Sequence, residues 1–529
     1  MRGSGIVWEL LARAAPKATD GTNHGPGLNR RDVLAGLAAI GLAPAFAPRA
    51  EAAINPCARI AIIGAGLAGL VALDRLVAAG FDATIYEARG RIGGRVHTSS
   101  GLPEAGLYVE DGAHLVNTNH TDILTLAKRF DIGLIDRGAM PARERFVVDG
   151  NEVSEEALIA EFRPLAAQIA ADAAAVDSDF DRHAPRFDAM SVKQYLDAAG
   201  ASASPRARSL VEATIRTEFG SEPGEVSALE LFFNLPAIND GKVALISGSD
   251  ERYSLVGGSS TIPRALAEPL TPRIRTGHAL VSVRRQGKAV MLAFANGETV
   301  TADRVIITVP AQVLRTIDFG DTLPASWQAL TQEFGCGRNE KINAGYAERP
   351  WEPLVGAGGA AWAVRTGNPG LFSEFWGASA GQDNVPAGVL TWFFGGNQVA
   401  ALQDMSPEDM LRGCEREIAP AIPSLAARSH RRTAWAADPY AQGAYSRFLP
   451  GQLTRFASHF WVEEEDGTVT PPLPSGPILF AGEHLSDSHT GYMNGAAQTG
   501  RLAADQLINA ARSKRSVRTN CAKNQRAPA

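Results

Sequence analysis

A glycine-rich turn near residue 64 has the residue types and spacing that bind a dinucleotide. The run Arg59–Ile63 is short, apolar and β-branched, as in a buried parallel strand, and Gly64-Ala65-Gly66-Leu67-Ala68-Gly69 follows it directly. In such a turn the first glycine permits a tight bend, the second lets backbone approach a pyrophosphate, and the third lets helix and strand pack closely. The phosphates would lie on unpaired N–H groups at the start of a helix expected from Leu70 to Gly80.

An acidic residue at the end of the next expected strand supports this interpretation. Ala83–Tyr86 is expected as that strand, and Glu87 follows it, 87 − 64 = 23 residues after the first glycine. A carboxylate about 20 residues on is the usual partner of a ribose hydroxyl. A glycine-rich turn alone is weak evidence, and Glu87 could be an ordinary strand-end acid, but the order strand, turn, helix, strand favours a dinucleotide.

The residues after Glu87 indicate which dinucleotide is bound. The run is Glu87-Ala88-Arg89-Gly90-Arg91-Ile92-Gly93-Gly94-Arg95, and its glycines and arginines suit a second loop over phosphate, with Arg89 and Arg95 as charge partners. This run resembles the second FAD-binding signature of the flavin-containing amine oxidases, the family of monoamine, polyamine and L-amino-acid oxidases. The resemblance implies FAD rather than NAD, and it covers about residues 57 to 512 in matching order.

Three residues of the later chain match the family's substrate side of the flavin. Lys341, in Asn339-Glu340-Lys341-Ile342, resembles the lysine that holds a water on flavin N5, although the sequence alone would make it a solvated strand-end residue. The resemblance implies that Trp435 lies against the isoalloxazine and that Tyr445 is one wall of an aromatic cage. Alternatively, these two aromatic residues belong to a loop packed in a core.

The most specific resemblance lies near the C-terminus. Pro477–His484 and Thr490–Ala497 are expected to form a buried strand, a loop and the start of a helix running to about Ala511. The resemblance implies that Gly482 and Glu483 hold the ribityl chain, that Tyr492 is the second cage wall, and that Met493 lies where helix N–H groups face the flavin. It also implies that the backbone of Leu280 contacts the adenine. Ala444 stands where some relatives carry a cysteine bonded to the flavin, so FAD is expected to be non-covalent.

The expected activity is oxidation of an amine. The resemblance implies hydride transfer from the carbon beside a neutral amine to flavin N5, giving an imine, a carbonyl product and, with O₂, H₂O₂. The arginine that clamps a carboxylate in some L-amino-acid oxidases is replaced by Leu115, which favours a plain amine, while Glu218 and Glu374 are candidate acids for a polyamine. L-amino-acid oxidase, polyamine oxidase, a different electron acceptor and a non-catalytic flavoprotein scaffold remain as alternatives.

The expected fold class is α/β (α+β), with a Rossmann-like FAD-binding domain and a β-meander interleaved with a substrate domain of mixed sheet and helices. The expected FAD-binding domain comprises 53–130, 250–318 and 450–512, and the substrate domain 131–249 and 319–449. A net charge of −6 suggests neither nucleic acid nor an anionic membrane as a partner, and a homodimer is left open. The cysteines Cys57, Cys336, Cys414 and Cys521 form no metal-type pair, and no metal is expected.

The two ends of the chain are expected to lie outside the folded part. Residues 1–52 would be a disordered start and a twin-arginine signal, because Arg30-Arg31 precedes a short apolar run and the A-x-A pattern at residues 50–52. The alternative is a disordered tail that happens to contain two arginines. The signal predicts export to the periplasm or the medium, and residues 513–529 would be a disordered tail without a membrane anchor.

Overall fold

The structure is a computed structural model of the 529-residue chain. It describes Asn55 and residues 58–512, except 103–105, 234–235, 240–241, 246–249 and 465. The expected export signal and the basic tail therefore lie outside the described residues. The described chain forms two compact units. The first unit comprises Arg95–Thr261 and Phe334–Ser458, and the second comprises 58–94, Ile262–Glu333 and 459–512.

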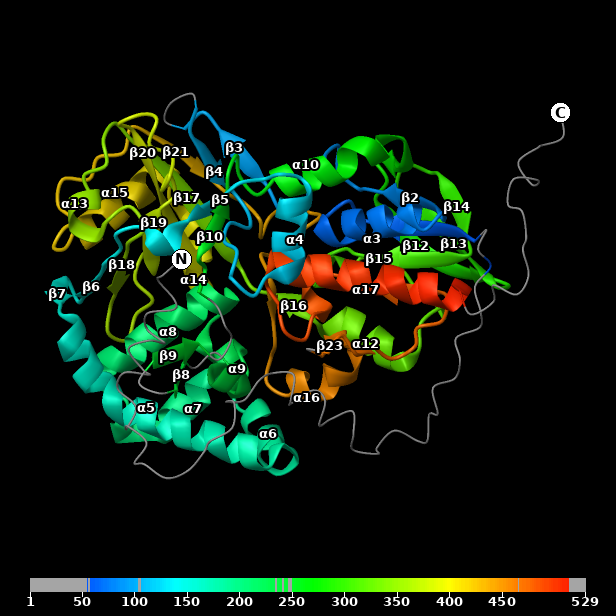
Figure 1. The fold of residues 1–529 in the computed structure, drawn as a ribbon. Coiled ribbons are helices and arrows are strands. Elements are labelled where there is room, and N and C mark those ends of the chain that lie inside the picture. The colour runs from blue at the N-terminus through cyan, green and yellow to red at the C-terminus, as the bar shows by residue number, and fades with distance from the viewer. Residues whose placement is uncertain are drawn as a thin grey trace. The chain divides into compact units, whose positions relative to one another are not determined.

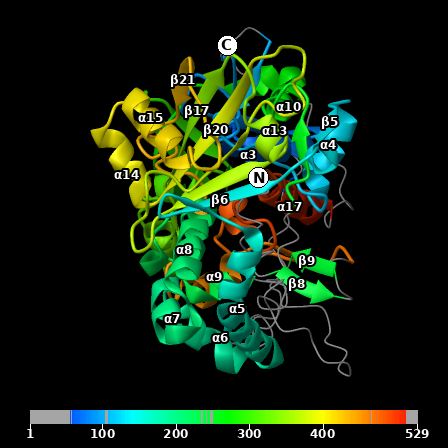
Figure 2. The ribbon, with the colours of Figure 1, turned by 90° about the vertical axis from the view of Figure 1, so that its left-hand side faces the viewer.

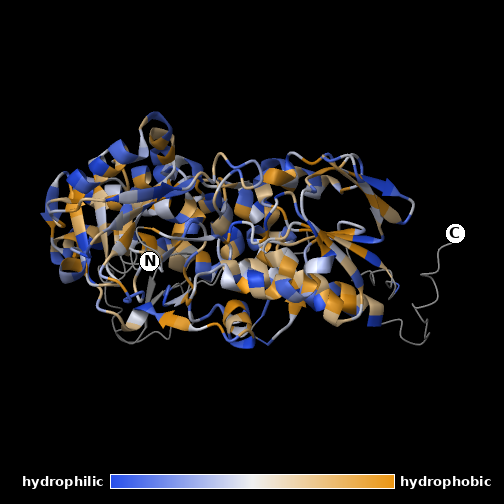
Figure 3. Ribbon diagram, turned by 90° about the horizontal axis from the view of Figure 1, so that it is seen from above, coloured by the Kyte–Doolittle hydropathy of each residue, from blue (hydrophilic) through white to orange (hydrophobic). Residues whose placement is uncertain are grey.

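The second unit is built on a parallel sheet that carries the glycine-rich turn. Its strands, in sheet order, are β11 (Ile274–Arg275), β2 (Asp82–Tyr86), β1 (Arg59–Ile63), β15 (Arg304–Ile307) and β25 (Ile478–Phe480). Helices α3 (Leu67–Ala78) and α17 (Met493–Arg512) run side by side against it (Figure 1). Orange segments in Figure 3 mark the hydrophobic residues, and Ile62 of β1 and Ile85 of β2 are fully buried. This sheet confirms the expected Rossmann-like layout.

An antiparallel meander follows in the same unit. It comprises β12 (Leu280–Gln286), β13 (Ala289–Phe294) and β14 (Thr299–Ala302), and Asn296-Gly297 makes the expected hairpin turn before β14. A single strand over Ile274–Val283 was expected, and this prediction is wrong. Gly277, with φ +74°, turns the chain between β11 and β12, so that β11 pairs with β2 while β12 pairs with β13.

The first unit is built on a mixed sheet of seven strands. In sheet order they are β21 (Ser429–Arg432), β17 (Asn339–Tyr346), β20 (Gly388–Gly395), β19 (Glu374–Gly377), β18 (Ala360–Val364), β6 (Glu144–Val148) and β7 (Asn151–Val153). Helices α14 (Asn397–Asp404) and α15 (Pro407–Ile418) lie beside this sheet (Figure 2).

The two faces of this sheet differ in character because side chains alternate along each strand. Ile342, Trp392 and Phe375 are cross-strand neighbours on one face and belong to the hydrophobic core that also takes in residues of α14 and α15. The adjacent register places Lys341, Phe393 and Glu374 in one row across β17, β20 and β19 on the opposite face. The face turned away from the core therefore carries ionisable groups.

Helices complete the first unit: α4 (Thr121–Arg129), α5 (Glu155–Ser178), α6 (Phe180–Asp188), α7 (Val192–Ala199), α8 (Pro205–Phe219) and α9 (Ala228–Phe233). α5 continues through Pro164, so the proline does not break the helix. Buried Phe162, Leu165 and Ile169 anchor α5 on both sides of the proline. Gly220 has the left-handed conformation that ends α8.

The remaining elements are short. The strands are β3 (Thr98–Ser100), β4 (Tyr108–Glu110), β5 (Leu134–Asp136), β8 (Pro236–Asn239), β9 (Lys242–Leu245), β10 (Tyr253–Leu255), β16 (Gly335–Cys336), β22 (Ser446–Arg447), β23 (Val462–Glu463) and β24 (Val469–Thr470). The helices are α10 (Thr261–Ala267), α11 (Ala311–Leu314), α12 (Ala325–Glu333), α13 (Glu352–Val355) and α16 (Gln452–Phe456). Together these elements confirm the expected mixed α/β class.

Candidate active site

The glycine-rich turn of the second unit has the geometry that a bound pyrophosphate requires. Gly64 has φ +105°, which suits glycine at the bend between β1 and α3. A Cβ on Gly69 would lie 2.0 Å from the Gly64 carbonyl oxygen, whereas a Cβ on Gly66 would meet no atom within 4 Å. Gly69 is thus fixed by packing, and the space beside Gly66 at the N-terminus of α3 fits the phosphates of FAD.

These two glycines should respond differently to substitution. Gly69→Ala is expected to destabilise the protein by about 1–3 kcal/mol or more, because the new methyl group overlaps backbone. Gly66→Ala should leave the melting temperature of the apoprotein nearly unchanged but weaken FAD binding about 10-fold or more, because backbone contact with a charged phosphate is lost. Thermal melts and flavin titration of both variants would measure this, and a Gly66→Ala protein that binds FAD normally would contradict the assigned role.

Glu87 and the second loop close around this turn. The N–H groups of Ala65 and Arg89 donate to the two Glu87 carboxylate oxygens at 2.7 and 2.8 Å. The N–H of Gly93 donates to the Ala65 carbonyl at 2.8 Å, so the two glycine loops are in contact. Each carboxylate oxygen can accept a further bond, so Glu87 retains capacity for a ribose hydroxyl. The roles of Ala88 and Arg89 toward FAD stay predictions.

The C-terminal segment gives the second unit a further set of groups for the cofactor. Glu483 is buried, and its carboxylate accepts the Gly491 N–H at 2.8 Å, which ties the end of β25 to the start of α17. The N–H of Gly482 is held by the Thr499 hydroxyl at 2.9 Å. Tyr492 directly precedes α17, and Met493 is its first residue. Glu483 therefore orders the helix N-terminus that was expected to face the flavin.

An aromatic cluster lies beside the position expected to contact adenine. Leu280 is buried and pairs with Phe294 across β12 and β13. The Phe294 ring stacks on Tyr86 with centroids 5.0 Å apart, and His278 meets both rings edge-on. The sequence analysis missed this cluster because its three residues come from separate strands and turns. The contact of Leu280 with adenine stays a prediction.

Lys341 is buried, so the solvated-lysine alternative does not hold. Only 7% of the residue is exposed. Its Nζ donates to the carbonyl oxygens of Gly112 at 2.7 Å and Glu110 at 3.2 Å. An ammonium has three donors, so one N–H remains to hold a water after these two bonds. Burial lowers the pKa of Lys341 to about 8, against the charges of Glu110 and Asp111, which raise it.

Trp435 meets the same short segment as Lys341. Its indole Nε1 donates to the carbonyl oxygen of Asp111 at 2.7 Å. Three consecutive carbonyls, from Glu110 to Gly112, therefore accept hydrogen bonds from the two residues that the sequence placed nearest the flavin. A Cβ on Gly112 would lie 1.9 Å from the Arg95 carbonyl oxygen, so this close approach requires glycine. The sequence analysis did not assign Gly112 to the site, because its contact with Lys341 joins segments 229 residues apart.

Tyr445 lies in the same unit, on the segment that carries Ala444. Its hydroxyl donates to the Thr217 carbonyl at the end of α8. Next to the β16–β22 pair, the Ala444 N–H donates to the Gly337 carbonyl and the Gly337 N–H donates to the Tyr445 carbonyl. The Arg95 guanidinium donates to the Ala444 carbonyl, so the structure places Arg95 beside the tyrosine segment, and its expected phosphate role is untested. Tyr492 belongs to the other unit, and its pairing with Tyr445 stays a prediction.

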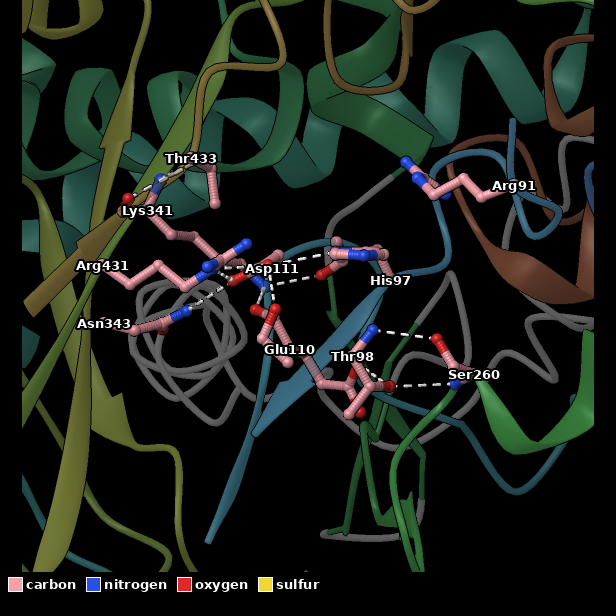
Figure 4. A network of polar contacts seen from close by, with 12 residues as sticks. Arg91, His97, Thr98, Glu110, Asp111, Ser260, Lys341, Asn343, Arg431 and Thr433 are labelled. Atoms are coloured by element: carbon pink, nitrogen blue, oxygen red, sulfur yellow. Dashed lines mark hydrogen bonds and ion pairs between the residues drawn. The ribbon is translucent and has the colours of Figure 1, made fainter. Parts of the chain in front are cut away.

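The Asp111 carboxylate is the centre of a polar network (Figure 4). It accepts bonds from His97 Nδ1 at 3.0 Å, the Ser99 hydroxyl at 2.5 Å, Arg431 Nε at 2.8 Å and Asn343 Nδ2 at 3.4 Å. Burial disfavours ionisation of Asp111, but the bonds from His97 and Ser99 and the charge of Arg431 outweigh it and hold its pKa below the usual range. Asp111 is thus a charged, fully engaged carboxylate.

Glu110 contributes a second buried carboxyl beside Lys341. It accepts bonds from the Ser259 N–H at 2.7 Å and the Thr98 hydroxyl at 2.9 Å. Burial nevertheless raises the pKa of Glu110 above its ordinary value, with the Lys341 charge among the opposing effects. The Glu110 and Lys341 charges therefore favour each other's ionised form, while burial disfavours both.

Glu374 lies on the same sheet face as Lys341, two strands away. It is fully buried, and neither carboxylate oxygen has a hydrogen-bond partner among the described residues. Burial raises its pKa well above the ordinary value, and the charges of Glu251 and Glu218 raise it further. The Glu374 register partner is Phe393, whose other neighbour is Lys341. A spacing of about 4.8 Å per strand puts Glu374 about 10 Å from Lys341.

The described residues contain neither a membrane-spanning helix nor a cluster of metal-binding side chains. None of their helices is both long and apolar enough to cross a bilayer. They contain no group of three or more His, Cys, Asp or Glu side chains arranged to hold a metal. Cys336 and Cys414 are buried free thiols, while Cys57 and Cys521 lie outside the described residues.

The fold and the site define a class of protein: a flavoprotein with a dinucleotide-binding unit and a buried lysine on a mixed sheet. Comparison with known proteins agrees, because the family model of flavin-containing amine oxidoreductases matches residues 67–508. The chain belongs to this family. It is therefore an FAD-dependent oxidoreductase that acts on amines, and the glycine turn and Glu483 segment described above fit the cofactor.

Individual relatives are distant but similar over most of their length. A rice (Oryza sativa subsp. japonica) protein named polyamine oxidase 1 is 28% identical over 506 residues, covering 84% of this chain and 96% of the relative. A flavin-containing amine oxidase of Oncorhynchus mykiss is 25% identical over 470 residues, covering 85% of each chain. The structure of a putrescine oxidase bound to putrescine shares the fold, with a TM-score of 0.70, 20% identity and coverage of 86% and 100%.

Proposed function

We propose that this protein oxidises the C–N bond of an amine, with FAD accepting a hydride at N5 and O₂ reoxidising the cofactor to give H₂O₂. The observation that carries this proposal is the burial of Lys341 on the carbonyls of Glu110 and Gly112. A lysine is expensive to bury, and such perturbed groups cluster at functional sites. Its remaining N–H would hold the water that the resemblance places on flavin N5.

The other residues of the site would bind and orient the amine. Tyr445 and Tyr492 would form a desolvated cage that disfavours the ammonium form, which leaves the nitrogen lone pair available. Trp435, fixed by its bond to Asp111, would present a rigid aromatic face. Because Ala444 has no nucleophile, FAD would be held without a covalent bond.

The buried acids favour a substrate with a second cationic nitrogen. Glu374 lacks a hydrogen-bond donor within the described residues, and an isolated buried carboxylate is strongly unfavourable. A second ammonium about 10 Å from Lys341 would supply that missing partner. Arg137 is near enough to lower the pKa of Glu251, but it is not among the charges acting on Glu374. We therefore propose a diamine or a polyamine as substrate.

Two alternatives are less well supported by the site. An L-amino-acid oxidase needs a cation for the substrate carboxylate, whereas buried Leu115 stands at the expected clamp position and Glu374 adds negative charge on the Lys341 face. A non-catalytic flavoprotein scaffold would give no reason to bury Lys341 and Glu374 on one sheet face at the cost of desolvation.

A substrate panel tests the proposed function. The purified protein should be yellow, should release its flavin on acid precipitation, and should bleach anaerobically with 1,4-diaminobutane and form peroxide in air. The matched monoamine, n-butylamine, should give a kcat/KM about 100-fold lower, since it lacks the second ammonium. A colourless protein, or flavin that no amine reduces, would favour the scaffold; preference for L-amino acids would favour the other oxidase class.

A further inference from the structure

The Asp111 side chain joins the segment from Glu110 to Gly112 to two other parts of its unit. The backbone N–H groups of Asp111 and Gly112 both donate to the His97 carbonyl, at 2.9 and 3.3 Å. The Asp111 carboxylate then accepts side-chain bonds from two directions, as Figure 4 shows. His97 and Ser99 approach from the chain around β3, and Asn343 and Arg431 approach from the seven-stranded sheet.

The sheet residues in this network are close neighbours of Lys341. Asn343 and Arg431 are directly paired across β17 and β21. Asn343 is two residues after Lys341 on β17, and so lies on the same face. The Asn343 carboxamide oxygen accepts the Thr391 hydroxyl at 2.6 Å, which fixes its orientation. The network therefore fastens the 110–112 segment to the same strand that carries the lysine.

We propose that Asp111 is a positioning residue: its carboxylate clips the 110–112 segment to β17 and β21, so that three successive carbonyls hold Lys341 and Trp435 in place. The carbonyls of Glu110 and Gly112 orient the ammonium, and the carbonyl of Asp111 orients the indole. Asp111 itself touches neither side chain with its carboxylate. This role deepens the proposed function, on which the importance of Lys341 rests.

The charge of Asp111 gives the proposal a second, electrostatic consequence. Asp111 and Glu110 are the charges that raise the pKa of Lys341 against the effect of burial. His114 also interacts electrostatically with Lys341. His97, which precedes β3, and Arg431 on β21 both bond to Asp111. Removing the Asp111 charge while keeping its shape should therefore lower the pKa of Lys341 below its wild-type value.

The test compares Asp111→Asn with Asp188→Asn. Asp188 is an equally buried acid in the same unit, bonded to the Ser227 hydroxyl at 2.8 Å and to the Thr454 N–H at 2.9 Å. In apoprotein carrying ¹³Cε-lysine, with Lys341→Met to assign the signal, Asp111→Asn should move the Lys341 titration to lower pH by about one unit, and Asp188→Asn should not. In the holoenzyme, Asp111→Asn should lower kcat about 10-fold. The decline of kcat at alkaline pH should also occur at a lower pH than in the wild type.

The outcomes separate this proposal from the proposed function. If Asp111→Asn lowers only the melting temperature, as Asp188→Asn should, and leaves both the titration and kcat unchanged, Asp111 is merely structural and the proposal is overturned. If no amine reduces the wild-type flavin but Asp111→Asn still moves the Lys341 titration to lower pH, Asp111 positions the segment as proposed. The proposed function would then be wrong. If Asp111→Asn does not fold, Arg431→Gln, which removes an exposed partner of the same carboxylate, should give a smaller change of kcat.

Discussion

Lys341→Met is expected to slow reoxidation of the reduced flavin by O₂ about 100-fold. Methionine keeps the length and the apolar stem of lysine but removes the charge and all three donors. The water that Lys341 would hold then loses its anchor, and the negative charge that develops on reduced oxygen loses its nearest cation. Stopped-flow mixing of the amine-reduced enzyme with aerated buffer measures the rate, and the reductive half-reaction should change much less.

A matched control is available on the surface of the same unit. Lys193 lies on α7 and forms an exposed i,i+4 ion pair with Asp197 at 2.8 Å. Lys193→Met should leave reoxidation unchanged, because exposed pairs of this kind contribute little. The rate of wild-type reoxidation should decline as pH rises through about 8, where Lys341 loses its proton. The rate for Lys341→Met should show no such decline. Normal reoxidation by Lys341→Met would remove the proposed role.

The cofactor-binding half of this site could be predicted from sequence because its signals are local. The glycine spacing from Gly64 to Gly69, the acid at Glu87 and the loop at Gly93 each lie within one short segment, and the structure gives them the expected strand–turn–helix setting. Strand period is also local, so the strands on either side of the glycine turn and the C-terminal strand and helix were expected at nearly the right positions. The expected strand over Ile274–Val283 is divided because a single turn at Gly277 decides the outcome.

The substrate half could not be predicted in the same way because its contacts join distant segments. Lys341 and Gly112 are 229 residues apart, and Arg431 and Asp111 are 320 apart. No sequence periodicity reveals such pairs, so Lys341 was supported by a family match alone, and nothing in the sequence singled out Asp111. Glu374 was a candidate acid by residue type, but its place on the Lys341 face depends on the register of β17, β20 and β19.

Glu374→Gln is expected to lower kcat/KM for 1,4-diaminobutane about 100-fold, which corresponds to about 2.7 kcal/mol. The amide has nearly the same shape as the carboxyl group but cannot become the anion that a buried ammonium needs as its partner. The value for n-butylamine should change less than about threefold, since no second ammonium is involved. Steady-state kinetics on this matched pair of amines measures the difference directly.

The same substitution should make the unliganded protein more stable. An acid whose pKa is raised in the folded state stays protonated while the unfolded chain has already ionised, so it costs stability as pH rises above the ordinary glutamate pKa. Glu374→Gln should therefore raise the melting temperature at pH 7 to 8, and the gain should vanish near pH 4. Loss of activity together with gain of stability is the signature of a group retained for binding.

Glu340→Gln is the control that tests whether the position of the buried carboxyl group determines the preference for the diamine. Burial also raises the pKa of Glu340, to about 7, but its carboxylate is bonded to the Ala436 N–H at 3.3 Å and lies on the opposite face of β17 from Lys341. Glu340→Gln should therefore leave the preference for the diamine unchanged. An equal loss for the diamine and the monoamine in Glu374→Gln, or the same selectivity change in both variants, would show that Glu374 does not bind a second ammonium. The substrate would then be a monoamine, and the buried carboxyl would need another partner.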